Sequence, residues 1–173
     1  MIFLLKITAM VLLGSGFVFG GRYLAAQYVK KSQIISDILL MISVIETQLR
    51  YACLPVSDLL RILCNTDKLK NLGFLENCRY KVSCGEPFPV AWKTAVKSEP
   101  EFCGLLGDYC NYLVQLGADI GSTDIEGQLS CCEYYKQIFE KELVLREENR
   151  KKYSKLYPTL GVMLGISAAI IIV

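Results

Sequence analysis

The end of the chain, Lys151–Val173, changes abruptly from charged to apolar. From Leu160 onward it holds no charged residue, and its only hydroxyl group belongs to Ser167. A surface this apolar must be removed from water, and a lipid bilayer is the simplest environment that does so. We therefore predict a membrane helix over residues 158–173, and we interpret the rest of the chain as what this helix anchors.

A second apolar stretch, Met1–Gly21, contains Lys6 as its only charge, and weaker apolar character continues beyond it. Because a bilayer-spanning helix needs about 20 residues, we predict an N-terminal membrane helix over residues 1–26. A cleaved signal peptide is the alternative, since Lys6 and Ala25-Ala26 resemble the two ends of one. The apolar run is, however, longer than the usual core of such a peptide.

Basic residues lie on the inner side of both apolar stretches. They are Arg22, Lys30 and Lys31 after the first stretch, and Lys151, Lys152 and Lys155 before the second. Basic residues next to membrane helices stay preferentially in the cytoplasm. Both stretches therefore predict one topology, in which residues 27–157 form a cytoplasmic domain held by a membrane helix at each end. Translocation of this middle part is the alternative.

The composition excludes several kinds of chemistry. The net charge is only +2, which provides no basic field for nucleic acid. The chain has no histidine, so the usual Ser-His and Cys-His nucleophile pairs are impossible. We expect a protein that is not an enzyme and that has no cofactor, no metal and no small-molecule substrate.

The sequence holds eight cysteines: Cys53, Cys64, Cys78, Cys84, Cys103, Cys110, Cys131 and Cys132. Most lie within helical patterns, so we predict free thiols that act as small core residues in a reducing compartment. A disulfide framework is one alternative, and a membrane-tethered thiol enzyme or redox protein is another. The spacing of Cys78 and Cys84 does not fit paired zinc ligands.

The middle of the chain has the pattern of successive helices. Over Gln33–Ala52, isoleucine and leucine recur every three or four residues. Leu54-Pro55 ends this helix, and a second one, Val56–Leu63, begins at once. Asn65–Pro89 is rich in asparagine, glycine and proline, which indicates loops and a short helix. Because short connections favour antiparallel neighbours, we predict an all-α fold, an antiparallel helical bundle.

Two further helices are predicted after Pro89. The first, Val90–Lys97, carries the only tryptophan, Trp92, which we interpret as a large core anchor in preference to a contact with a partner. The second covers Glu101–Leu116, where Cys103 and Cys110 share a face, and Gly117 is expected to end it in a left-handed conformation.

The last helix is predicted to run from the turn at Gly121 as far as Tyr157, where Pro158 bends or restarts it. Thr123 and Glu126 have the spacing of a capping box at its start. The acidic residues around this turn could also form an acid pair or a cation site, but a capped turn fits them better. They are Asp119, Asp124 and Glu126.

The second half of this helix, Arg146–Lys155, is a run of charges. Such a run usually forms a solvated face with ion pairs four residues apart, as in Glu142–Arg146, Glu147–Lys151 and Glu148–Lys152. Its basic residues also precede the predicted C-terminal membrane helix, and anionic lipid attracts basic residues there. The candidate partner or lipid contacts are Arg146, Arg150, Lys151, Lys152, Lys155 and Trp92.

Five of these segments, in this order and at this spacing, resemble the stage III sporulation protein AB family of endospore-forming Firmicutes. The first is the N-terminal apolar helix, and the second is the helix Ile35–Tyr51 with Glu46 together with the following turn that holds Pro55. The other three are the segment Ala91-Trp92-Lys93, the turn Leu116–Asp124 followed by Gln128, and the lysine-rich, then apolar end Lys151–Val173. The cysteine content departs from the family pattern, and Asn65–Pro89 matches none of its features.

The resemblance implies a helical cytosolic domain held by the mother-cell membrane that surrounds the forespore. It implies a structural role in the complex that links the two cells, with other stage III membrane subunits as partners. The family is also similar in role to the platform proteins of type II secretion machines. By that analogy, the resemblance implies docking of the cytoplasmic ATPase of the complex.

Overall fold

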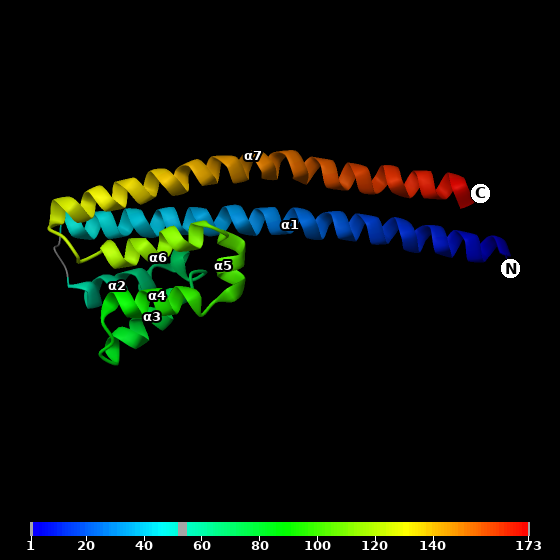
Figure 1. The fold of residues 1–173 in the computed structure, drawn as a ribbon. Coiled ribbons are helices and arrows are strands. Elements are labelled where there is room, and N and C mark those ends of the chain that lie inside the picture. Colours follow the sequence, from blue (N-terminus) through cyan, green and yellow to red (C-terminus); the bar gives the residue numbers. More distant parts are fainter. Residues whose placement is uncertain (1, 52–54, 173) are drawn as a thin grey trace. The chain divides into compact units, whose positions relative to one another are not determined.

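The computed structural model describes the backbone of residues 2–51 and 55–172, the side chains of residues 29–51 and 55–152, and a few further side chains nearer the ends. All regular structure in this described part is helical (Figure 1). The chain forms two compact units. We call Gln33–Leu143 the helical bundle, and we call Met1–Ser32 together with Val144–Val173 the terminal pair.

Helix α1 runs without a break over Ile2–Tyr51, and its second half is the centre of the helical bundle. The predicted amphipathic helix is confirmed there up to Tyr51, while Ala52 lies outside the described residues. Its apolar face is fully buried or nearly so, at Ile34, Ile35, Ile38, Met41, Ile42, Ile45 and Leu49. These spacings of three and four place the side chains on one face, so burying them removes a continuous stripe from water.

Short elements follow Pro55. Helix α2 covers Val56–Asn65, and the N–H groups of Asp58 and Leu59 donate to the Pro55 carbonyl oxygen, at 3.0 and 3.1 Å. The 3₁₀ helix η1 covers Asp67–Leu69, and helix α3 covers Phe74–Ser83. The expectation of loops and one short helix in this region is therefore confirmed.

Helix α4 covers Phe88–Lys97 and begins two residues earlier than predicted. The prediction of one helix over Glu101–Leu116 is wrong. Two helices occupy this region, α5 over Pro100–Leu106 and α6 over Tyr109–Asp119. The reason is Gly107, whose φ of 62° no right-handed helix can contain.

A disulfide joins Cys103 in α5 to Cys110 in α6, with 5.3 Å between the two Cα atoms. The prediction of free thiols is wrong for this pair, because the break between α5 and α6 turns the two sulfur atoms toward each other. Cys64, Cys78, Cys84, Cys131 and Cys132 are free, as predicted, but only Cys78 and Cys132 are buried core residues, and Cys84 is exposed. Cys53 lies outside the described residues.

The turn before the last helix also differs from its prediction. Gly117 does not end a helix, since α6 continues to Asp119, and Gly121 is the residue that adopts a positive φ, 81°. The capping residue is Asp124, whose carboxylate accepts a hydrogen bond from the Gly127 N–H at 3.1 Å. The prediction of a capping box at Thr123 and Glu126 is therefore wrong, because helix α7 begins one residue later than that motif requires.

Helix α7 extends over Ile125–Ile172. Its backbone stays helical across Pro158, so the helix does not restart there. Within the described residues, one stretch, Val29–Tyr51, is long and apolar enough to cross a membrane. This stretch includes the buried apolar face of α1 in the helical bundle, from Ile34 to Leu49. The side chains of the predicted membrane helices lie mainly outside the described residues, so both helices stay predictions.

Candidate functional site

Trp92 is fully buried in the helical bundle, so it belongs to the core and offers no surface to a partner. Its indole N–H donates to the Leu113 carbonyl oxygen at 2.8 Å, which satisfies the one polar group that it buries. The ring of Phe74 meets the indole edge to face, with 5.1 Å between centroids. Trp92 therefore joins α3, α4 and α6. It is no longer a candidate for contact with a partner, and the remaining candidates are the basic residues of α7.

Gly117 provides the space that Trp92 occupies. A Cβ atom at this position would lie 2.0 Å from the indole Cδ1 atom, well inside the distance at which two carbon atoms repel. Helices α4 and α6 therefore approach closely because residue 117 has no side chain. This role was missed by the sequence analysis, which read Gly117 as a helix end.

The basic candidates of α7 lie in the terminal pair. Arg146 donates from Nη1 to the Lys31 carbonyl oxygen at 3.2 Å, which links α7 to α1 within this unit. Arg150 is partly buried, whereas Lys151 and Lys152 are exposed. The side chain of Lys155 lies outside the described residues. Exposed lysines on one stretch of helix can attract anionic groups, and their contact with lipid or protein stays a prediction.

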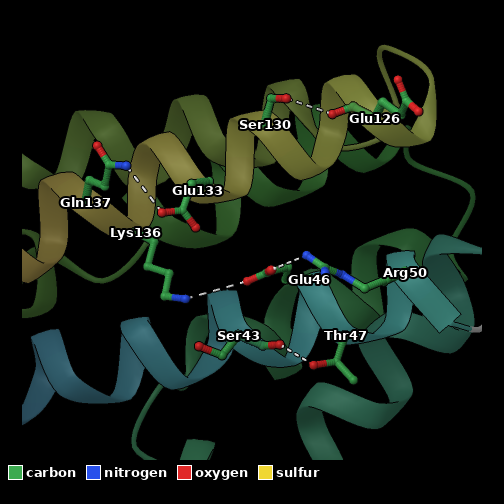
Figure 2. A network of polar contacts seen from close by, with 9 residues as sticks. All are labelled: Ser43, Glu46, Thr47, Arg50, Glu126, Ser130, Glu133, Lys136 and Gln137. Carbon is green, nitrogen blue, oxygen red and sulfur yellow. Dashed lines mark hydrogen bonds and ion pairs between the residues drawn. The ribbon is translucent and has the colours of Figure 1, made fainter.

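A polar network connects α1 to α7 within the helical bundle (Figure 2). At its centre, the Glu46 carboxylate accepts from Arg50 Nη2 at 2.8 Å and lies 3.7 Å from Lys136 Nζ. Glu46 is only 21% exposed, so its charge is partly shielded from water. Glu46, which belongs to the family resemblance, thus pairs with Arg50 of α1 and with Lys136 of α7.

Replacing Glu46 with glutamine is expected to lower the free energy of unfolding by about 1 kcal/mol, because it removes the charge that pairs with both Arg50 and Lys136. The matched control is Glu76→Gln, since Glu76 pairs only within its own helix and is highly exposed. That control should change stability by less than about 0.5 kcal/mol. Urea unfolding of the protein in detergent, followed by Trp92 fluorescence, measures both. Equal effects of the two substitutions would contradict a special role for Glu46.

Four of the five free thiols in the described residues are buried or partly buried. Burial raises the pKa of the Cys78 thiol to about 12 and that of the Cys132 thiol to about 11. Burial also raises the pKa of Cys64 and Cys131 above the ordinary value. Because the thiolate is the nucleophile, these pKa values make the four thiols less reactive at neutral pH.

Alkylation of the folded protein at pH 8 is therefore expected to modify the exposed Cys84 first and to leave Cys78 and Cys132 unmodified until the protein unfolds. The two buried thiols ionise at higher pH in the folded chain than in the unfolded chain. Their contribution to stability is thus present below about pH 9 and is lost as the pH rises toward their folded pKa values. Mass spectrometry of the alkylated peptides measures the order of modification. Early labelling of Cys78 would contradict this account of the pKa values.

The acidic residues at the turn before α7 have structural partners. Asp119 accepts a hydrogen bond from the Tyr135 hydroxyl at 2.7 Å, and Asp124 caps α7. Burial, and then the hydrogen bond to Asp119, raises the pKa of Tyr135. Among the described residues, no group of three or more acidic or cysteine side chains could hold a metal ion. The capped turn is therefore the interpretation that the geometry supports.

The sequence analysis also missed a surface groove between α4 and α6, with a volume of about 690 Å³. Its lining residues are Pro89, Val90, Lys93, Thr94, Lys97, Ser98, Val114 and Ala118. The spacing of Val90, Thr94 and Ser98, four residues apart, is visible in the sequence. The groove could not be predicted from this spacing, because the sequence does not show that α6 lies beside these three residues.

The described residues define an all-helical protein in which Glu46 pairs with basic side chains of α1 and α7 and the tryptophan joins three helices. The family model described as stage III sporulation protein AB matches residues 6–173, which is nearly the whole chain. The chain therefore belongs to this family and is a stage III sporulation protein. Neither the curated proteins nor the solved structures yielded a match.

Proposed function

We propose that this protein is a membrane-anchored structural subunit of the complex that links the mother cell to the forespore. The observation that carries the proposal is the family match over residues 6–173. Further support comes from the chain itself, because α1 and α7 both continue from residues of the helical bundle into the apolar stretches at the two ends. The bulk of the chain faces the cytoplasm in this proposal, and the anchors lie in the mother-cell membrane around the forespore.

The proposed partners are the other stage III membrane subunits and the cytoplasmic ATPase of the complex. The exposed Lys151 and Lys152, together with Arg150, are the proposed contacts near the membrane. Deletion of the gene is expected to block sporulation after engulfment. A tagged full-length protein should then co-purify with the ATPase or the neighbouring membrane subunits. Normal spores from the deletion strain would overturn the proposal.

The cytoplasmic orientation has its own test, because Cys84 is a naturally exposed thiol in the helical bundle. A maleimide that cannot cross membranes should label this thiol only after the cells are permeabilised. The control is Cys84→Ser, in which most of the labelling should disappear, since the other free thiols among the described residues are buried or partly buried. Labelling of intact cells would place the bundle on the other side of the membrane.

The Cys103–Cys110 disulfide is the one observation that favours the alternative of a translocated bundle, since disulfides persist in oxidising compartments. The five free cysteines of the described residues favour the cytoplasm instead. The alternative of a thiol enzyme is disfavoured by the raised pKa values of four of these thiols. Replacing Cys64, Cys78, Cys131 and Cys132 with alanine is expected to leave assembly of the complex intact wherever the protein still folds.

A further inference from the structure

The groove between α4 and α6 has an apolar floor although two hydroxyl groups line it. The Thr94 hydroxyl donates to the Val90 carbonyl oxygen at 2.7 Å. The Ser98 hydroxyl donates to the Ala95 carbonyl oxygen at 2.7 Å and accepts from Asn77 at 2.9 Å. These hydroxyl groups are satisfied by their own neighbours, so a ligand in the groove need not provide polar partners for them.

The side chains of the floor are small and stand in two rows, and those of Val90, Val114 and Ala118 are apolar. Val90 and Thr94 lie four residues apart on α4, Ser98 follows at the C-cap of this helix, and Val114 and Ala118 lie four residues apart on α6. Val90 is 54% exposed, and Ala118 is exposed as well. Rows with this repeat leave a channel into which the side-chain ridge of another helix can pack. The shape therefore fits an α-helix that lies in the groove.

Two lysines set the charge of the groove. Lys93 and Lys97 lie one helical turn apart on α4, and both are exposed. Among the described residues, no acidic side chain forms an ion pair with either of them. Many basic residues of the helical bundle are paired within the chain, including Arg61 with Asp58 and Lys70 with Asp67. The two lysines are thus available for acidic groups that come from outside the bundle.

We propose that this groove binds an amphipathic helix of a partner protein, and that this helix carries acidic residues one turn apart beside a stripe of small apolar side chains. The apolar stripe covers Val90 and Ala118, and the acidic pair meets Lys93 and Lys97. A concave surface with an apolar floor and basic residues suits a helix better than a flat bilayer. The groove would be the surface through which the protein binds a partner in its proposed assembly role. The proposal rests on that role only for the identity of the partner.

The first experiment uses purified full-length protein in detergent and two synthetic helical peptides. Both peptides carry a leucine and alanine stripe, and beside it one has two glutamates four residues apart where the other has two lysines. The glutamate peptide should bind at least about tenfold more tightly than the lysine peptide. The variant K93E/K97E should reverse this preference. The control K68E changes an exposed lysine outside the groove and should leave the preference unchanged.

Equal binding of the two peptides, or an equal effect of K68E and K93E/K97E, would overturn the proposal. Circular dichroism of each variant distinguishes a lost contact from a lost fold. Because these measurements use purified protein, they fail or succeed independently of the sporulation phenotype that tests the proposed function.

The second experiment identifies the occupant in sporulating cells. A benzophenone amino acid replaces Thr94, an exposed residue of the groove floor. Mass spectrometry should find a crosslink to a helical segment with acidic residues one turn apart, and K93E/K97E should abolish this crosslink while K68E does not. Crosslinks to lipid, or to a second copy of this chain, would overturn the proposal in favour of a membrane surface or self-association.

Discussion

Replacing Trp92 with alanine is expected to lower the free energy of unfolding by about 3–5 kcal/mol, as removal of a large buried aromatic side chain usually does. The indole is fully buried, and it contacts Phe74 and Phe88 at centroid distances of 5.1 and 5.5 Å. The substitution also removes the donor to the Leu113 carbonyl oxygen. Since an isolated domain is stable by only about 5–15 kcal/mol, this single change removes a large part of the total.

Urea unfolding followed by far-ultraviolet circular dichroism measures this effect, because the variant has no tryptophan fluorescence. The matched control is Lys93→Ala on the same helix, where the side chain is exposed and the change should stay within about 0.5 kcal/mol. Similar losses from the two substitutions would show that Trp92 does not join the helices as described.

Replacing Gly117 with alanine is expected to lower the free energy of unfolding by about 1–3 kcal/mol or more, because the added methyl group overlaps the indole of Trp92. Two effects oppose each other at this position. Alanine favours a helix over glycine by about 1 kcal/mol, but a Cβ atom 2.0 Å from the Cδ1 atom of a fully buried ring cannot be accommodated without moving the ring or the helix. The overlap therefore outweighs the gain in helix propensity.

The control for Gly117→Ala is Gly104→Ala in α5, where no described atom lies within 4 Å of the added Cβ apart from the adjacent residues and the backbone of the same helix. That substitution should stabilise the protein slightly, by up to about 1 kcal/mol. The two substitutions thus differ in sign although both replace a helical glycine. Trp92→Phe should reduce the cost of Gly117→Ala, because the smaller ring leaves room for the methyl group. Additive effects of Trp92→Phe and Gly117→Ala would contradict a direct overlap.

Much of the fold could be predicted from local sequence patterns. The buried face of α1 follows from apolar residues three and four apart, and Pro55 marks the start of the next helix in both the sequence and the structure. The core position of Trp92 followed from its size and apolar ring. These features depend on residues that are close together in the chain, so a sequence displays them directly.

The candidate site was less predictable, because it depends on distances between segments. Glu46 was visible as part of a family pattern, but its pairing with Lys136 requires α1 and α7 to lie side by side in the bundle. The groove beside Lys93 and Lys97 likewise exists only because α6 packs against α4. The basic run of α7 remains a predicted contact surface, with Lys155 outside the described side chains.

The sequence by itself determined that this protein is helical, that it has strongly apolar ends and that it resembles the family to which it belongs. The tertiary structure decided the break at Gly107, the Cys103–Cys110 disulfide, and the role of Gly117 as the space for Trp92. The physical reason is that helix periodicity is a property of neighbouring residues. A close approach between helices, and the pairing of two thiols, is a property of the folded chain alone.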